Sequence, residues 1–123
     1  MKRIEFYETL SGYCPVAEFL DSLTSQQAQK VVWVFKLIEE LPQVPSKFLK
    51  KLVNSEDVWE VRVSFAKETF RFLGFFDGKK LIILNHAFRK KSQKIPRQDI
   101  KIAKKRKSEY LLRRISGAPK NIY

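Results

Sequence analysis

Apolar and polar residues alternate through residues 59–65, and this is the clearest pattern in the chain. The apolar positions of this stretch are Trp59, Val61, Val63 and Phe65. Its polar positions are Glu60, Arg62 and Ser64. A period of two is typical of a β-strand that buries one face and exposes the other. We therefore expect the face that carries Glu60 and Arg62 to be available for chemistry.

A second alternating stretch follows directly and predicts the partner strand of a hairpin. Its apolar positions are Phe70, Phe72 and Phe76. If Ala66 and Lys67 form the centre of the turn, Arg71 lies directly across from Arg62 on the polar face. Like charges in opposed positions destabilise a sheet. The pair therefore indicates either an anionic ligand or two arginines on a solvated face.

A third strand is predicted after Asp77-Gly78, because this dipeptide favours a tight hairpin turn. The apolar run at residues 81–84 is typical of a strand that is buried on both faces. It leads to His86 and to the basic run at residues 89–94, at one end of the sheet. A bulge at Gly78 would reverse the parity of this strand, so the pattern leaves the face of His86 open.

Two helices are predicted in the N-terminal half, after a short strand at residues 2–7. Pro15 suits the first turn of the first helix, where its missing N–H costs nothing. Thr24 and Gln27 have the spacing of a capping box, which begins a longer second helix. Pro42 ends that helix, since proline cannot continue it.

The rest of the chain predicts a connector and a basic last helix. Residues 46–53 fit either a further turn or a short edge strand. Pro96 opens the helix, whose predicted buried line is Ile100, Ala103, Tyr110 and Leu111. The residues expected mostly outside are Lys101, Lys104, Lys105, Arg106 and Lys107. The order of elements predicts a single α+β domain with a twisted, mainly antiparallel sheet, two N-terminal helices on one face, and the basic C-terminal helix alongside. We expect the arginine face to be concave and wet.

Length and charge narrow the class of protein. With 123 residues, the chain is expected to form one domain. It carries 25 Lys and Arg against 13 Asp and Glu, a net charge of +12, and 14 of the basic residues lie within residues 79–114. Such an excess is typical of proteins that meet phosphate backbones. An anionic membrane surface is the competing interpretation, but no lipidation signal or separate amphipathic basic helix supports it.

The scarcity of Cys and His disfavours disulfide-bonded proteins and metalloproteins. The single Cys14 allows no intramolecular disulfide, and one His allows no Cys/His cluster, so we expect no metal and no cofactor. The N-terminal stretch has no apolar signal-peptide core, and no run approaches the length of a membrane span. We therefore expect a protein of the reducing cytoplasm.

Three motifs occur in order: WEVRV at residues 59–63, FRFLGFF at residues 70–76 and LIILNHAFRKKSQKIP at residues 81–96. In this order, and followed by a basic helix, they resemble the RelE-type mRNA interferase toxins of bacterial toxin–antitoxin systems, in particular the phage-derived HigB-like branch. The similarity spans residues 2–112. We expect the toxin domain to cover residues 1–117, with residues 118–123 as a C-terminal tail.

The resemblance implies a RelE-like fold and a metal-independent endoribonuclease that cleaves mRNA on the translating ribosome. It also implies a cognate antitoxin, a helix-turn-helix protein of the HigA type, through which alone the toxin would meet operator DNA. No membrane partner is implied. The alternative from another class is a non-enzymatic basic nucleic-acid-binding module, in which the same face only holds phosphate.

RNA cleavage without a metal needs a base for the ribose 2′-OH, an acid for the departing 5′-oxygen, and cations for the phosphorane. Arg62 and Arg71 suit the last task, because guanidinium groups make bidentate contacts to phosphate. His86 is either a catalytic base or a structural residue at a strand end. Glu60 is either a base or the ion-pair partner of an arginine. Lys90 either donates a proton, if neighbouring cations lower its pKa, or lies in a solvated basic loop.

The other basic candidates are expected to bind nucleic acid without sequence preference. They are Arg89, Lys91, Lys94, Lys104 and Lys105. Phe75 and Phe88 are either stacking surfaces for an unstacked base or core residues. Trp33 on the second helix is a candidate contact for the antitoxin, which we expect on the N-terminal helices or over the basic face. Phe35 is expected in the core.

Overall fold

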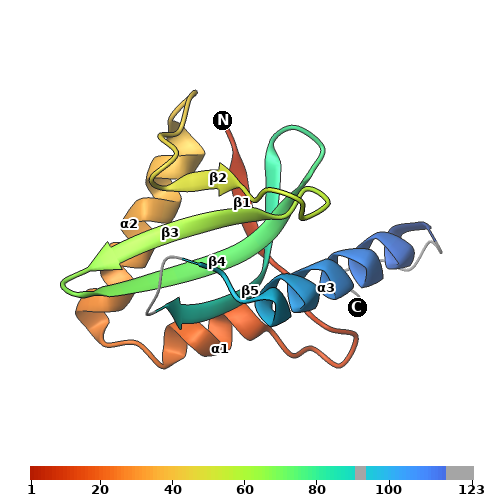
Figure 1. Ribbon diagram of the computed structural model, residues 1–123, viewed down its shortest axis with the longest axis horizontal. Helices are drawn as coiled ribbons and strands as arrows, with labels where there is room; N and C mark the ends of the chain where they lie inside the picture. The colour runs from red at the N-terminus through yellow and green to blue at the C-terminus, as the bar shows by residue number, and fades with distance from the viewer. Residues whose placement is uncertain (91–93, 116–123) are drawn as a thin grey trace.

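The computed structural model describes residues 1–90 and 94–115 of the chain (Figure 1). Its elements are β1 (Arg3–Phe6), α1 (Pro15–Asp21), α2 (Ser25–Glu40), β2 (Leu49–Lys51), β3 (Trp59–Phe65), β4 (Glu68–Asp77), β5 (Leu81–Lys90) and α3 (Arg97–Ile115). Lys91, the expected domain end at residue 117 and the expected tail at residues 118–123 lie outside the described residues. Within the described part of the chain, no helix is long and apolar enough to cross a bilayer.

The strands form one five-stranded sheet in the order β1-β5-β4-β3-β2. β1 is parallel to β5 and the other neighbours are antiparallel, so the expected mainly antiparallel α+β fold is confirmed. For residues 46–53 the sequence allows a turn or a short edge strand, and the structure has the edge strand β2 there. The hairpin of β3 and β4 places Arg62 directly across from Arg71, as the alternation predicts.

The two N-terminal helices cover one face of the sheet, the face away from α3 in Figure 1. α1 begins at Pro15, and α2 begins with the predicted capping box between Thr24 and Gln27. The main core lies between these helices and the sheet, and its buried members include Val16, Val31, Val34, Phe35, Ile38, Val61, Val63, Phe70 and Phe72. Burial of such side chains, at roughly 25 cal/mol per Å² of apolar surface, is the main force that holds the helices to the sheet.

The basic helix α3 packs on the opposite face, across β4 and β5 (Figure 1). Its Ala103 shares a buried cluster with Leu73, and its Tyr110 packs on Phe75 with ring centroids 5.3 Å apart. The expectation of an open, wet arginine face is therefore wrong for much of this face. The reason is that β4 places Leu73 and Phe75 on the same parity as Arg71, and these apolar groups need a cover.

A β-bulge in β5 decides which face His86 occupies. Gly74 of β4 lies opposite Leu84, but the next residue of β4, Leu73, lies opposite His86, so Asn85 has no partner across the strand pair. One extra residue moves all following side chains to the other face. His86 therefore lies on the arginine side. Without the bulge it would face α1 and α2.

Gly74 permits the close approach of the two strands at this bulge. A Cβ at this position would lie 2.0 Å from the backbone carbonyl oxygen of Ile83, so no other residue fits without movement of the backbone. The bulged Asn85 is fully buried, and its side-chain amide donates to the backbone carbonyl of Ala103 at 3.0 Å. The bulge thus also connects β5 to α3.

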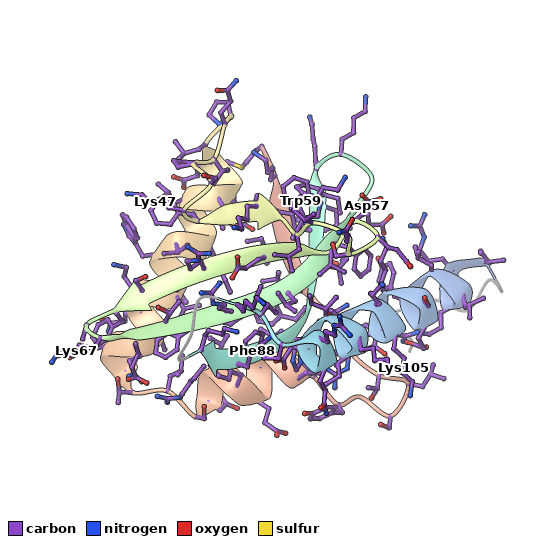
Figure 2. The ribbon with its side chains drawn as sticks, in the orientation of Figure 1. Lys47, Asp57, Trp59, Lys67, Phe88 and Lys105 are labelled. Carbon is purple, nitrogen blue, oxygen red and sulfur yellow. The ribbon has the colours of Figure 1, made fainter. Side chains whose placement is uncertain are left out.

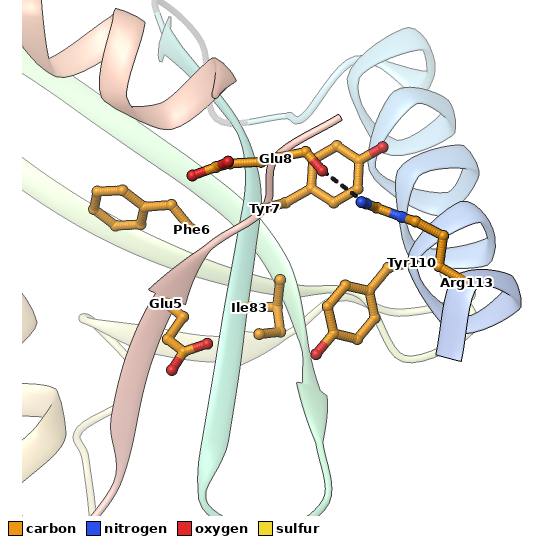
Figure 3. A pocket seen from close by; sticks show the side chains of 7 residues that line it. All are labelled: Glu5, Phe6, Tyr7, Glu8, Ile83, Tyr110 and Arg113. Carbon is orange, nitrogen blue, oxygen red and sulfur yellow. Dashed lines mark hydrogen bonds between the residues drawn. The ribbon is translucent and has the colours of Figure 1, made fainter. Parts of the chain in front are cut away.

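Residues near the two ends of the described chain meet beside β1, at a place we call the β1–α3 junction (Tyr7, Glu8, Glu109 and Arg113). Figure 3 shows Tyr7, Glu8 and Arg113 of this junction. The Tyr7 hydroxyl donates to Glu109 at 2.7 Å, and Arg113 donates to the carbonyl oxygen of Glu8 at 2.7 Å. Burial and the bond to Glu109 raise the pKa of Tyr7 to about 12. The cavity at the junction has a volume of about 20 Å³, which suits a single water molecule rather than a substrate.

Candidate active site

Three charged residues on the α3 side of the sheet form an ion cluster, which we define as Glu60, Arg62 and Arg71. Glu60 and Arg62 come from β3, and Arg71 comes from β4. Glu60 forms an ion pair with Arg71, and both side chains are almost fully buried. The Nη2 atom of Arg62 lies 3.4 Å from the other carboxylate oxygen of Glu60. Glu60 is therefore the partner of both arginines, which is one of the two roles considered for it.

The ion cluster has an excess positive charge and donors that are not used. Two guanidinium groups face one carboxylate, and the Nε atoms of Arg62 and Arg71 are buried with no acceptor among the described residues. A buried N–H without an acceptor costs free energy, so native structures rarely leave one unpaired. The arrangement favours an anionic ligand over the alternative of two solvated arginines. The Arg62 side chain is 28% exposed, so an anion can reach it from solvent, with Arg71 beneath.

Lys90 ends β5 on the same face as the ion cluster, opposite Thr69 of β4. It is buried, and burial lowers the pKa of its ammonium group. The positive charge of Arg71 lowers this pKa further, whereas Asp99 and Glu60 act in the opposite direction. Burial rather than the expected crowding by cations is thus the larger cause. A lysine whose pKa is lowered gives up its proton more readily than a solvated one.

His86 is held through both ring nitrogens by α3. Nε2 lies 2.7 Å from Asp99 Oδ1, and Nδ1 lies 3.4 Å from Nη1 of Arg106. Arg106 also donates to the backbone carbonyl of Asn85 at 2.8 Å. Because a carboxylate only accepts hydrogen bonds, Asp99 favours the tautomer with the proton on Nε2 and the lone pair on Nδ1. These contacts serve the structural role considered for His86, and its role as a base stays a prediction.

Asp99 and Arg106 are site residues that the sequence patterns do not single out. The expectation that Arg106 lies mostly outside is wrong, because it is half-buried against β5. The available signal is the helical spacing of four and three residues that runs through Asp99, Ala103, Arg106, Tyr110 and Arg113. Residues at this spacing share one face of a helix, so burial of Ala103 and Tyr110 also turns Asp99 and Arg106 towards the sheet.

The structure does not bring Arg89 to the ion cluster. Successive side chains of a strand point to opposite faces, and Arg89 precedes Lys90, so it lies on the side of α1 and α2. There it pairs with Glu68 and lies over the ring of Phe70. Lys94 is exposed, between the end of β5 and the start of α3. Arg89 and Lys94 are the described residues of the basic run that were predicted to contact nucleic acid. Of these two, Lys94 is the one that is exposed near the site.

The basic residues on the outside of α3 differ in whether they are already paired. Lys104 lies 3.4 Å from Glu56, in the loop between β2 and β3. Lys105 belongs to an exposed row with Arg97 and Lys101, and no member of this outer row has an ion-pair partner among the described residues. Figure 2 shows Lys105 on α3, away from the sheet. The outer row is therefore free to meet phosphate, whereas Lys104 is partly neutralised.

The two candidate stacking residues have different environments. Phe75 is 1% exposed beneath Tyr110, so it is a core residue and not a stacking surface. Phe88 is half-buried beside the N-terminal end of α3, with its ring centroid 5.4 Å from that of His86 (Figure 2). Base stacking on Phe88 stays a prediction.

Comparison with known proteins bears on this site. The family model described as Phage derived protein Gp49-like (DUF891) matches residues 18–108. The chain belongs to this Gp49-like family. The Gp49-like family is associated with the toxins of toxin–antitoxin systems. No curated protein matches the chain.

The matched segment of this Gp49-like protein begins in α1 and ends in α3. It therefore includes the ion cluster, Lys90, and His86 with its partners on α3. The finer resemblance to the HigB-like branch of the RelE toxins stays a prediction for this Gp49-like protein.

Proposed function

We propose that this Gp49-like protein is the toxin of a type II toxin–antitoxin system, a metal-independent endoribonuclease that cleaves mRNA on the translating ribosome in the cytoplasm. The observation that carries the proposal is the ion cluster, in which one buried carboxylate holds two opposed arginines whose Nε donors lack acceptors among the described residues. Phosphate oxygens suit guanidinium donors in charge and geometry. The family association supports the toxin role.

In the proposed reaction the ribose 2′-oxygen attacks the neighbouring phosphorus and the bond to the 5′-oxygen breaks. The products are a 2′,3′-cyclic phosphate and a free 5′-hydroxyl, so a proton leaves the 2′-oxygen and another reaches the 5′-oxygen. Arg62 and Arg71 bind the non-bridging oxygens, where negative charge accumulates in the transition state. By analogy with oxyanion-hole donors, each is worth about 3 kcal/mol of transition-state stabilisation.

We assign proton transfer to His86 and Lys90, which lie on this face and have lower ordinary pKa values than arginine. His86 accepts the 2′-OH proton at Nδ1, where the substrate displaces the 3.4 Å contact from Arg106, and Asp99, at 2.7 Å from Nε2, stabilises the imidazolium that forms. Lys90, with its lowered pKa, donates to the 5′-oxygen. Its pKa responds to Arg71, Glu60 and Asp99, which indicates that its ammonium lies within electrostatic range of both the ion cluster and the His86 pair. Glu60 holds the arginines and transfers no proton.

The proposal is tested by replacing Arg62, the arginine that solvent reaches. We expect Arg62→Ala to abolish growth arrest on induced expression and to lower cleavage of mRNA on programmed ribosomes by about a hundredfold. The matched control is Arg3→Ala, because Arg3 also pairs with a glutamate two residues away on the same strand, Glu5, but lies outside the site. Arg62 suits this test better than Arg71, whose loss would leave Glu60 buried without its main partner.

Two outcomes contradict the proposal. One is a folded wild-type chain that leaves mRNA ends unchanged on programmed ribosomes. The other is an Arg62→Ala variant that cleaves as fast as wild type, since the phosphorane would then be stabilised elsewhere. Circular dichroism of each variant shows whether the fold is intact.

The alternative is a non-enzymatic nucleic-acid-binding module, and the free outer row of α3 is the observation that favours it. Arg97, Lys101 and Lys105 can hold a phosphate backbone without any reaction. This alternative predicts RNA binding with no new mRNA ends and no growth arrest, so the same assays separate the two functions.

The partners under the proposed function are mRNA, the ribosome and an antitoxin. The family association implies the antitoxin. A helix-turn-helix antitoxin of the HigA type, with operator DNA bound only through it, stays a prediction.

A further inference from the structure

The outer surface of α2 carries two adjacent exposed apolar residues. Val32 is 45% exposed and Trp33 is 54% exposed, whereas the neighbouring Val31 and Val34 are fully buried in the core. α2 therefore has more apolar positions than its contact with the sheet uses. A single exposed apolar residue is ordinary, but contiguous apolar surface often marks an interaction site.

A second aromatic ring extends this surface. Trp33 packs edge-to-face against Phe48, which lies just before β2, with ring centroids 6.5 Å apart. Lys30 lies 5.6 Å from the centre of the Trp33 ring, and Lys47 lies 5.0 Å from the centre of the Phe48 ring. We define the α2 patch as Lys30, Val32, Trp33, Lys47 and Phe48.

The charged residues that neighbour the α2 patch in the sequence are all lysines. Residues 22–38 and 42–54 contain lysines but no Asp or Glu. Neither Lys30 nor Lys47 has an ion-pair partner among the described residues. The patch is thus an apolar centre with a positive rim, which suits a partner that has an apolar stripe and acidic flanks.

The α2 patch and the candidate active site lie on opposite faces of the sheet, and they adjoin through one backbone hydrogen bond, from the Arg62 N–H to the carbonyl oxygen of Phe48 at 2.9 Å. α2 packs on the sheet face opposite to α3 (Figure 1). The ion cluster, Lys90 and His86 lie on the α3 side. Lys47 lies beside the start of β2, away from α3 (Figure 2). RNA bound at the ion cluster therefore leaves the α2 patch free, and a partner on the patch need not touch the cluster.

The ring geometry favours a protein over RNA as the occupant. Single-stranded RNA uses open aromatic faces on which bases stack. In the α2 patch one lysine lies over each ring, the two rings meet edge-to-face, and the third apolar residue, Val32, is aliphatic. Such a surface suits the side chains of an amphipathic helix, with tryptophan as its main anchor.

We propose that the α2 patch docks an acidic amphipathic helix of the antitoxin. The identity of the partner rests on the proposed function, since an antitoxin is what a toxin of this family needs. Aspartate or glutamate side chains of that helix pair with Lys30 and Lys47, and its apolar stripe covers Val32 and Trp33. The antitoxin is thereby anchored on the face opposite to the ion cluster.

The first experiment measures binding of the full chain to the purified product of the reading frame that adjoins its gene, the antitoxin in this proposal. Trp59→Phe leaves Trp33 as the only tryptophan, so its fluorescence should shift to shorter wavelength when the patch is covered. By calorimetry, Trp33→Ala should weaken binding at least about thirtyfold, as expected of an anchor tryptophan. The control Val53→Ala removes another exposed apolar side chain, outside the patch, and should leave affinity unchanged.

The charged rim is tested separately with Lys30→Glu combined with Lys47→Glu. This change should slow association more than it speeds dissociation, and the loss should be larger at low salt, because the rim acts by long-range attraction. Lys67→Glu combined with Lys79→Glu, at two exposed turn positions outside the patch, makes the same change in net charge and is the control. In cells, Trp33→Ala should remain toxic but should no longer be rescued by co-expression of the antitoxin.

Several results overturn the docking proposal. They are a wild-type chain that does not bind the adjoining product, a Trp33→Ala variant with unchanged affinity, and a variant that loses binding to a labelled single-stranded RNA while it keeps the protein partner. The proposed function fails in a different way. A chain that binds the product through Trp33 but cleaves no mRNA keeps the docking surface and refutes the ribonuclease.

Discussion

Glu60 is the residue on which the geometry of the arginines depends. Its carboxylate is 1% exposed and contacts both Arg71 and Arg62, so it fixes two cations at one place in the sheet. An alternating pattern predicts that these residues share a face, and the register confirms it. The pattern does not show which part of that face a helix will cover. It therefore does not predict that Arg71 is buried.

The charge on Glu60 should be essential for stability. Glu60→Gln leaves Arg71 buried without a counter-charge, and we expect the free energy of unfolding to fall by about 3 kcal/mol. Urea denaturation measures this loss. The control is Glu68→Gln, which removes the carboxylate from an exposed pair with Arg89 and should cost less than about 1 kcal/mol. Equal losses for the two variants would show that the ion cluster is not held by this charge.

Replacement of Lys90 should increase the stability of the fold and decrease the rate of mRNA cleavage. Its lowered pKa means that the folded chain binds this proton less tightly than the unfolded chain, so the charge destabilises the fold at neutral pH. We expect Lys90→Met to raise the melting temperature at pH 7 and to lower mRNA cleavage about a hundredfold. The gain in stability should disappear as the pH rises through 10.5, the ordinary pKa of lysine, because both states of the wild type are then neutral.

Melting curves of wild type and Lys90→Met between pH 7 and pH 11 check this prediction. Lys67→Met, at an exposed turn position, is the control and should change neither property. A Lys90→Met variant that is less stable at pH 7 would show that the ammonium is well paired in the fold.

At the scale of elements, the strands and helices are largely predictable and the bulge is not. Proline, the capping box and the period of two locate the element starts and the hairpin, because these are local effects. The bulge depends on how β4 and β5 fit against each other and against α3, where Asn85 finds Ala103. The sequence suggests Gly78 as the place for a bulge, whereas the structure has it at Asn85. The face of His86 is therefore undecided by the sequence.

Gly74 offers a test of the bulge. Because a Cβ there would meet backbone atoms of Ile83 and Leu84, we expect Gly74→Ala to lower the free energy of unfolding by about 3 kcal/mol. We also expect it to reduce cleavage in the molecules that remain folded, since the position of His86 depends on this strand pair. Urea denaturation and single-turnover cleavage measure the two effects.

The matched control is Gly78→Asn. Gly78 has a φ of +82°, but a Cβ added there would meet no atom within 4 Å, and asparagine tolerates this backbone region better than most residues. A Gly74→Ala variant as stable as the control would mean that the strands separate easily at the bulge.

At the scale of the whole molecule, the charge of +12 is not spread evenly. On α3, Arg106 and Arg113 turn inward and Lys104 is paired with Glu56. Lys107 and Arg114 also have partners, so among the described basic residues of this helix only the outer row is free. The composition predicts a partner that carries phosphate groups. It does not show which basic side chains are used inside the fold and which are free to bind that partner. That separation depends on the packing of α3, which is a long-range property.

RNA binding should therefore depend on salt in proportion to the free cations. The slope of log affinity against log salt changes by about 0.7 for each phosphate contact to a single strand, so Lys101→Gln combined with Lys105→Gln should flatten it by about 1.4. Lys104→Gln is the control and should flatten the slope by less than the value of about 0.7 for one contact, because Lys104 already pairs with Glu56. Filter binding of labelled RNA between about 50 and 200 mM salt measures the slope. An affinity that does not change with salt would rule out phosphate contacts.

The β1–α3 junction joins the first strand of the described chain to its last helix. Tyr7 and Glu8 bond to residues that lie 102 and 105 positions later in the chain. β1 also has no sheet neighbour until β5 is made, and His86 has no Asp99 until α3 follows. During its synthesis the chain therefore lacks both the His86–Asp99 contact and the junction until α3 has been made. Under the proposed function, the ribosome that produces a molecule of this protein is consequently spared by that molecule until α3 has emerged.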